Sequence, residues 1–249
     1  MDELPEAART IVHRRCGDLR AVEAVPVGQS AFKFVLTTEL GRVFLKGTTG
    51  PRAAIEARVQ PHLPPIAPRL LWHEETGDLH LLAFEHIEGR YPDLRLASPD
   101  LALIADALGR LSFCQVPDLP VLPAERRFGP LTDPASAALL TGRALVHTDP
   151  VKENFLIHDG RVTIVDWAWP TFGAAWLDTL SMAVRLIEAG HSLDQAHQWA
   201  GQIPAWHDAT PDALAAYATV RAAVARRNGN PIERTWNLFL GGLAQSSGA

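Results

Sequence analysis

The sequence contains very little lysine. Of its 23 basic residues only Lys33, Lys46 and Lys152 are lysine, and the others are arginine. Arginine can supply a surface charge, so a lysine retained in such a chain indicates a position that needs a compact ammonium group on a flexible stem. Chance is the alternative explanation for three residues. If Lys33 and Lys152 merely face solvent, arginine should replace either of them with little loss.

Cysteine and long apolar runs are also scarce. Cys16 and Cys114 show no metal or disulfide spacing, which fits a reducing, cytoplasmic environment. No apolar run approaches the roughly 18 residues of a membrane span. The acidic N-terminus has no apolar signal region, so we expect neither secretion nor a membrane. The net charge of -5 argues against nucleic acid as a partner.

Secondary-structure signals divide the chain into two regions. With 249 residues, of which 47% are hydrophobic, the chain suits one large domain or two small lobes. The first region predicts strands, with one helix that Gly50 and Pro51 begin and that extends to residue 63. The predicted strands are 21–27, 31–38, 42–47, 69–74 and 79–87, with a hairpin turn at 75–78. The sequence thus predicts an α+β fold of two parts, 1–86 and 87–249.

The second region reads mainly as helix. Ser98 begins a helix with an apolar stripe, and a short helix near 134–142 precedes a strand at 144–147. Two further strands, 155–157 and 162–165, flank a strong hairpin signal. All later segments are predicted to be helical. Ser192 with Gln195 makes a capping box, and Thr210 begins another helix.

The most informative segment surrounds this hairpin. Asp149 and Asn154 precede it, and Asp166 follows it, twelve residues after Asn154. Phosphoryl transfer needs one carboxylate to orient the attacking hydroxyl group and hard oxygen ligands to hold Mg²⁺ on the phosphates. These three side chains can supply all of these groups. The hairpin should bring Asn154 and Asp166 back to one place.

These residues resemble a known family. The similarity lies in His147-x-Asp149-x4-Asn154, two apolar strands, and Val165-Asp166-Trp167. The pattern resembles the catalytic segment of the aminoglycoside phosphotransferases and choline kinases, which are relatives of protein kinases. The resemblance implies that Asp149 is the catalytic base and that Asn154 and Asp166 bind Mg²⁺. It also implies ATP as phosphate donor and a small-molecule hydroxyl group as acceptor.

The resemblance gives two further residues a supporting role and has two departures. His147 would brace the loop, and Asp178 would support it from the following helix. Family members often carry glycine where Thr148 stands, and they carry proline two residues before the asparagine. Here Pro150 follows Asp149 directly. Lys152 holds an unusual position, from which it either reaches the γ-phosphate or faces water.

The first region supplies nucleotide-binding candidates. Gly28 and Ser30 lie between two predicted strands, where backbone N–H groups can approach a phosphate, although an ordinary hairpin turn is the more common explanation of such residues. Lys46 ends a Val-Phe-Leu run; such a lysine either extends to solvent or, in a kinase lobe, reaches the α- and β-phosphates. Glu56, the only acid on the next helix, is then its natural partner.

The resemblance also implies the overall architecture. It describes a bilobal, protein-kinase-like fold with a β-rich N-lobe containing one helix and a mainly α-helical C-lobe. Residues 1–86 would form the nucleotide-binding lobe, and 87–249 the catalytic and substrate-binding lobe. The hinge that offers backbone groups to adenine would be Phe84-Glu85-His86-Ile87.

Three other functions are alternatives to this interpretation. His147 and Asp149 form an H-x-D pair that His191, His197 or His207 could complete as an Fe(II) oxygenase triad. The oxygenase fold needs several strands between the H-x-D pair and the distal histidine, where this sequence predicts helices. No G-x-S-x-G motif supports a serine hydrolase. A non-catalytic nucleotide-binding protein of kinase fold is the remaining alternative, and the full set of candidate residues argues against it.

The acceptor is less well defined. From residue 167 onward the sequence contains six acids and five arginines, so this stretch is nearly neutral. A polycationic aminoglycoside should instead meet a carboxylate-rich pocket. Six of the seven tryptophans lie in this stretch; most should pack in the core, with Trp169 the best candidate for contacting a ligand. We expect an aminoglycoside-like antibiotic or a related amino or sugar metabolite, with a choline-type or sugar-type acceptor as the alternative.

Overall fold

The computed structural model describes residues 4–26, 30–114, 116 and 119–246. They form two compact units, one running to Glu88 and including Asp166–Ala168, the other containing Gly89–Val165 and the chain from Trp169 onward. The division therefore falls between Glu88 and Gly89. No helix among the described residues is long and apolar enough to cross a membrane.

A five-stranded antiparallel sheet forms the first unit, in the order β1-β2-β3-β5-β4. The strands are β1 (Leu19–Ala24), β2 (Phe32–Thr38), β3 (Gly41–Thr49), β4 (Leu70–Thr76) and β5 (Leu79–Glu85). All five predicted strands are present, with shifted ends. The turn between β4 and β5 consists of Gly77 and Asp78, and Gly77 adopts a left-handed φ of 59°, which glycine tolerates best.

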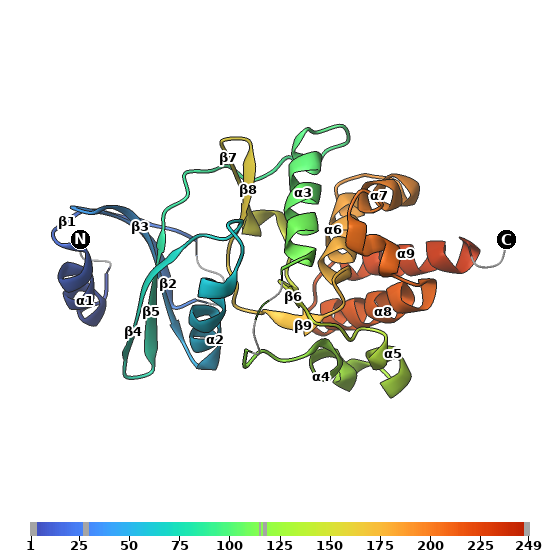
Figure 1. Ribbon diagram of the computed structural model, residues 1–249, viewed down its shortest axis with the longest axis horizontal. Helices are drawn as coiled ribbons and strands as arrows, with labels where there is room; N and C mark the ends of the chain where they lie inside the picture. The colour runs from blue at the N-terminus through green and yellow to red at the C-terminus, as the bar shows by residue number, and fades with distance from the viewer. Residues whose placement is uncertain (1–3, 27–29, 115, 117–118, 247–249) are drawn as a thin grey trace. The chain divides into compact units, whose positions relative to one another are not determined.

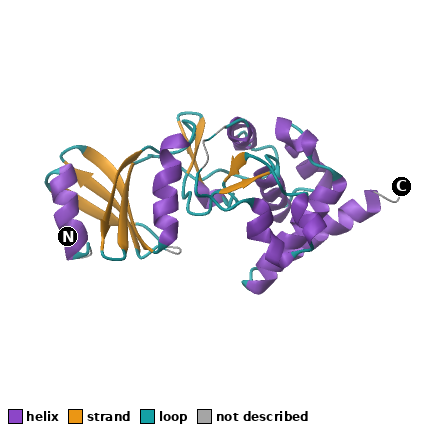
Figure 2. Ribbon diagram, turned by 60° about the horizontal axis from the view of Figure 1, so that its bottom comes forward, coloured by secondary structure: helices purple, strands orange, loops and turns teal. Residues whose placement is uncertain are grey.

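Two helices cover opposite faces of this sheet (Figures 1 and 2). Helix α1 (Glu6–Cys16) packs on the face that carries Leu36 and Leu45. Helix α2 (Pro51–Val59), extended by a 3-10 turn at Gln60–His62, packs on the face that carries Leu82 and Phe84. Side chains alternate along a strand, so Lys46, next to Leu45 in β3, lies on the α2 face.

Helix α1 corrects the prediction of a single helix in this region. Its buried positions, Ala8, Val12 and Cys16, recur every four residues but are small or moderate in size. Its N-cap is Pro5, which makes no side-chain capping bond. The helix is therefore stabilised by packing on the sheet rather than by strong local signals.

The second unit is mainly helical. Its helices are α3 (Asp100–Ser112), α4 (Ala124–Phe128), α5 (Pro134–Ala138), α6 (Leu177–Glu188), α7 (Leu193–Ala200), α8 (Pro211–Arg227) and α9 (Glu233–Ser246). Short 3-10 turns occur at Gly129–Leu131, Lys152–Asn154 and Pro204–Asp208. Two small antiparallel pairs complete it, β6 (Ala144–Val146) with β9 (Thr171–Gly173) and β7 (Phe155–His158) with β8 (Arg161–Ile164).

Local signals explain most of these elements. The capping box of Ser192 and Gln195 starts α7, and the Thr210 side chain caps α8, as predicted. Strand β9 was not predicted, because three residues after a proline carry no periodicity. Tyr217 lies at the centre of the core and makes edge contacts with Trp176 and Trp236. Of the six tryptophans from residue 167 onward, five are thus buried in the core, and Trp169 is half-buried.

Candidate active site

Lys46 is the centre of a buried charge cluster in the first unit. Its Nζ atom lies 2.8 Å from Oε2 of Glu56 and 2.6 Å from Oδ1 of Asp166. Only 5% of the Lys46 side chain and 3% of the Glu56 side chain are exposed. The predicted ion pair between Lys46 and Glu56 is therefore present despite its short spacing, and Lys46 does not extend to solvent.

The protonation of this cluster follows from its charges. Burial alone would lower the pKa of Lys46, but the carboxylates of Glu56 and Asp166 outweigh it and raise that pKa. Burial raises the pKa of Glu56, and Lys46 offsets this only in part. Burial would likewise raise the pKa of Asp166, yet Lys46 and Lys33 lower it to about 2. Asp166 is consequently ionised at neutral pH, and 31% of its side chain is exposed.

Lys33 joins the cluster, so it does not merely face solvent. Its Nζ atom lies 3.2 Å from Oδ2 of Asp166, and 14% of its side chain is exposed. Lys33 and Lys46 are directly opposite each other on β2 and β3. Each ammonium thus contacts a different oxygen of the same carboxylate. The scarcity of lysine was the available signal for Lys33, but its partner is 133 residues away and no local pattern identifies it.

In the second unit, Asp178 fixes the loop that follows β6. Its carboxylate accepts hydrogen bonds from the backbone N–H groups of His147 (2.6 Å) and Thr148 (2.8 Å). Asp178 is 2% exposed, and burial raises its pKa. The support that the resemblance implied from the following helix, α6, is therefore direct and made through the backbone.

Thr148 occupies a backbone conformation that favours glycine. Its φ is +66°, in the left-handed region that β-branched residues avoid. Hydrogen bonds hold it there: Oγ1 donates to the carbonyl of Trp169 at 2.7 Å, and Arg221 donates to the Thr148 carbonyl at 2.6 Å. This φ explains why glycine is common at the corresponding place in the family that the loop resembles. The role of Arg221 was not predicted, since it lies 73 residues away.

His147 and Asn154 close the loop around Asp149. Nε2 of His147 donates to the carbonyl of Val165 at 2.9 Å, and its Nδ1 accepts the Asp149 N–H at 3.3 Å. Nδ2 of Asn154 donates to the carbonyl of Asp149 at 2.9 Å. The backbone groups of Asp149 are thus occupied, while its carboxylate has no hydrogen-bond partner among the described residues.

The hairpin positions Asn154 as predicted from its turn. The carbonyl of Asn154 accepts the N–H of Val165 at 2.9 Å, which places Asn154 opposite the residue that precedes Asp166 in the chain. Asn154 is buried, and its Oδ1 atom has no hydrogen-bond partner in the part of the chain that the structure describes. An amide oxygen of this kind is a suitable ligand for Mg²⁺.

The remaining nucleotide-binding candidates are Gly28, Ser30 and the predicted hinge residues 84–87. Gly28 is outside the described residues, and Ser30 lies in a bend before β2. Phe84 is paired with both neighbouring strands and packs against Phe44. Glu85 is also engaged, because its N–H donates to the carbonyl of Arg69. His86 and Ile87 follow the end of β5 and therefore lie outside the strand.

The oxygenase alternative is not supported by the geometry. Nε2 of His147 is bonded to a carbonyl, as are Nε2 of His191 (to Leu94) and Nε2 of His207 (to Gly201). His197 packs edge-on against Trp206. Among the described residues, none of these histidines belongs to a cluster with metal-ligand geometry.

The chain has the protein-kinase-like fold shared by aminoglycoside phosphotransferases and choline kinases. It superimposes on a thermostable mutant of aminoglycoside phosphotransferase APH(4)-Ia with a TM-score of 0.68, 15% identity, and coverage of 96% of this chain and 98% of the other. Choline kinase LicA from Streptococcus pneumoniae gives 0.64 and 15%, covering 96% of this chain and 100% of the other. Spectinomycin phosphotransferase APH(9)-Ia, in complex with ADP and spectinomycin, gives 0.55 and 14%, with 92% of each chain covered. No family sequence model and no curated protein matches the sequence.

Proposed function

We propose that this protein is a small-molecule kinase that transfers the terminal phosphate of ATP to a hydroxyl group. The observation that carries the proposal is the buried Lys46, whose ammonium joins Glu56 to Asp166. A buried lysine held by two acids is costly unless its charge is used, and contacting nucleotide phosphates is such a use. Structures of the same fold bind ADP or AMP-PNP, which supports the choice of nucleotide.

In this proposal Asp149 acts as the general base. Its backbone is held by His147 and Asn154, while its carboxylate is left to accept the proton of the acceptor hydroxyl group. Asp178 and Arg221 act as positioning residues, because they fix the preceding Thr148 through hydrogen bonds rather than contacting substrate.

The donor chemistry fits a magnesium ion. Asp166 is ionised and partly exposed, with lone pairs beyond those that Lys33 and Lys46 engage, and Asn154 offers Oδ1. We assign these two residues as the Mg²⁺ ligands. When bound, the ion would neutralise charge on the β- and γ-phosphates. Lys46 would orient the α- and β-phosphates, and His86 and Ile87 would offer backbone groups to adenine.

A cavity of about 430 Å³ is the candidate acceptor site. It is lined in part by Val151, Lys152 and Glu153, which directly follow Asp149 and Pro150 in the chain. It lies within the second unit and contains equal numbers of acids and bases, which pair as Asp93 with Arg95, Glu153 with Lys152 and Glu188 with Arg185. This balance favours an amino or sugar alcohol of low net charge over a polycation. No aromatic side chain of the described residues lines it, which disfavours a choline cage.

Mass spectrometry tests the proposal directly. The full chain with ATP and Mg²⁺ is incubated with a panel of sugars, amino alcohols, choline and aminoglycosides, and each product is examined for the mass of one phosphate. Phosphorylation by wild type and its loss in Asp149→Asn would support the kinase. Tight ATP binding without transfer to any member of a broad panel would favour the non-catalytic alternative.

A further inference from the structure

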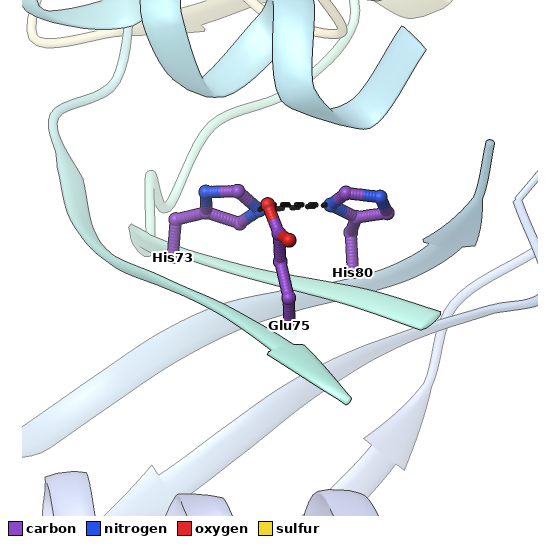
Figure 3. Close-up of side chains that lie close together, drawn as sticks. All are labelled: His73, Glu75 and His80. Atoms are coloured by element: carbon purple, nitrogen blue, oxygen red, sulfur yellow. Dashed lines mark hydrogen bonds and ion pairs between the residues drawn. The ribbon is translucent and has the colours of Figure 1, made fainter. Parts of the chain in front are cut away.

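The β4–β5 hairpin of the first unit brings together three metal-ligating side chains. His73 and Glu75 are two residues apart on β4, and Glu75 lies directly opposite His80 on β5. Side chains two residues apart share a face of a sheet, and so do directly opposed residues. The register alone therefore places all three on one face, which also carries Leu82 and is covered by α2 (Figure 3).

The ligand atoms converge within the span of a single ion. Nε2 of His73 lies 3.1 Å from Nδ1 of His80, and Oε1 of Glu75 lies 3.4 Å from that Nδ1 and 3.8 Å from that Nε2. Atoms bound to Zn²⁺ at about 2.0–2.1 Å in tetrahedral positions lie roughly 3.3–3.4 Å apart. The observed separations span this value without any rearrangement of the strands.

A hydrogen bond between the two rings does not account for the whole cluster. The imidazoles stack with centroids 5.3 Å apart and an angle of 11°, and one N–H can join them. In that neutral pair a single proton lies between the two facing nitrogens. The carboxylate oxygen of Glu75 then adds a third set of lone pairs beside them, although its side chain is 59% exposed and has room elsewhere. A cation is the partner that satisfies all three atoms together.

The donor set selects the class of metal. Two imidazoles and one carboxylate are the ligands of catalytic-type zinc sites, whereas Mg²⁺ and Ca²⁺ prefer oxygen alone. The histidine side chains are 21% and 13% exposed, so the rings are held by the protein while the carboxylate completes the site from the solvent side. We propose that His73, Glu75 and His80 bind one divalent transition-metal ion, Zn²⁺ by preference, with a fourth position for water or an external ligand.

Such an ion would link an edge strand to its neighbour. β4 is the last strand of the sheet, and β5 is its one pairing partner among the described residues. Zinc bound across the two strands would fasten this edge and stabilise the first unit, because a ligand that binds only the folded state shifts the unfolding equilibrium. The site uses none of the residues assigned to phosphate transfer, so its existence does not depend on the proposed kinase activity.

The test is zinc binding by the full, untagged chain after dialysis against a chelator. Calorimetry should give one Zn²⁺ per chain, with Mg²⁺ failing to compete. His80→Asn should weaken binding by at least the roughly 10–100-fold that loss of an outer-shell partner costs in zinc sites. Glu75→Gln changes an exposed side chain, so it keeps the test valid if His80→Asn folds poorly. Co²⁺ should show the strong visible absorption of tetrahedral coordination in wild type, and His80→Asn should lose it.

A matched control separates this site from adventitious zinc on the surface. His13 of α1 lies 3.3 Å from Asp18, and both side chains are exposed; within the described part of the chain this histidine–carboxylate pair has no third ligand. His13→Asn should leave zinc affinity unchanged and should keep the zinc-induced rise in melting temperature that His80→Asn loses. The proposal fails if wild type binds Zn²⁺ no more tightly than His80→Asn, or if His13→Asn lowers the affinity as much as His80→Asn does.

Discussion

The two units hold the acids of the candidate site by different means. In the first unit, Glu56 and Asp166 meet the ammonium groups of Lys46 and Lys33. In the second, Asp178 meets two backbone N–H groups. An ammonium on a flexible stem can exchange one anionic partner for another, whereas a backbone N–H has a fixed position. The first arrangement suits groups that must adapt to a charged ligand, and the second suits a loop that must keep its shape.

The largest expected effect is the loss of turnover when Asp149, in the loop that follows β6, is replaced. Asp149→Asn retains the size of the side chain but removes its basicity, so turnover of an identified acceptor should fall by about 10²–10⁴-fold. Nucleotide affinity should stay near that of wild type, because the cluster around Lys46 is unchanged. Steady-state kinetics and ATP calorimetry check both statements. Wild-type turnover in this variant would remove Asp149 from the mechanism.

The next effect concerns the adaptable cluster. Asp166→Ala should abolish the tightening of ATP binding by Mg²⁺, since it removes the ionised ligand. Asn154→Ala should reduce that tightening less, because a neutral amide attracts the ion more weakly. Calorimetry with and without Mg²⁺ measures both variants. An equal Mg²⁺ dependence in wild type and Asp166→Ala would rule out the assignment.

Replacing each of the three lysines by arginine should lower kcat/KM for ATP by three different amounts. Lys46→Arg should lower kcat/KM for ATP by at least about tenfold, roughly 1.4 kcal/mol, because a planar guanidinium does not fit between Glu56 and Asp166. Lys33→Arg should lose less, since Lys33 pairs with Asp166 and with no second acid of the described residues. Lys152→Arg should lose little, because its side chain is 55% exposed.

Thermal melts are the control for misfolding in this series. Equal kinetics for all three variants would make the scarcity of lysine a matter of composition alone. A loss at Lys152 as large as that at Lys46 would instead favour the alternative in which Lys152 contacts the transferred phosphate.

The stability of the folded protein at low pH depends on the charges around Asp166. Its pKa in the folded protein is about 2, below the ordinary 3.8, so its ionised form stabilises the fold above about pH 4. That contribution, at most about 2.5 kcal/mol, is lost as the pH falls from about 4 to about 2. The stability gap between wild type and Asp166→Asn should therefore close over this interval in urea titrations. A gap independent of pH would show that the two lysines do not hold the carboxylate.

Local sequence patterns predicted many of the secondary-structure elements and part of the candidate site. The features that they did not predict depend on contacts between residues distant in sequence. The β7–β8 hairpin, the capping box at Ser192 and the pairing of Lys46 with Glu56 follow from residues at most ten positions apart. The contacts of Lys33 with Asp166 and of Arg221 with Thr148 join residues 133 and 73 positions apart. No periodicity or spacing signals such a pair, because only the tertiary fold brings it together.

The cluster of His73, Glu75 and His80 is an intermediate case. The hairpin that contains it was predicted, and the pattern His-x-Glu before the turn with histidine after it is visible in the sequence. Only the register shows that the three side chains share a face, since a slip of one residue would separate them.

The smallest expected effect tests how firmly the second unit's loop is held. Thr148→Gly relieves a left-handed conformation that costs other residues about 1–2 kcal/mol, but it loses the hydrogen bond to Trp169, worth about 1 kcal/mol, and adds chain entropy. The gain and the two losses nearly cancel. The unfolding free energy of Thr148→Gly, measured in urea, should therefore stay within about 1 kcal/mol of wild type. Thr148→Ala keeps the strain and loses the bond, so it should be the least stable variant. Thr148→Ser retains both features and should match wild type. If glycine were less stable than alanine here, the left-handed φ could not be the conformation that the loop adopts.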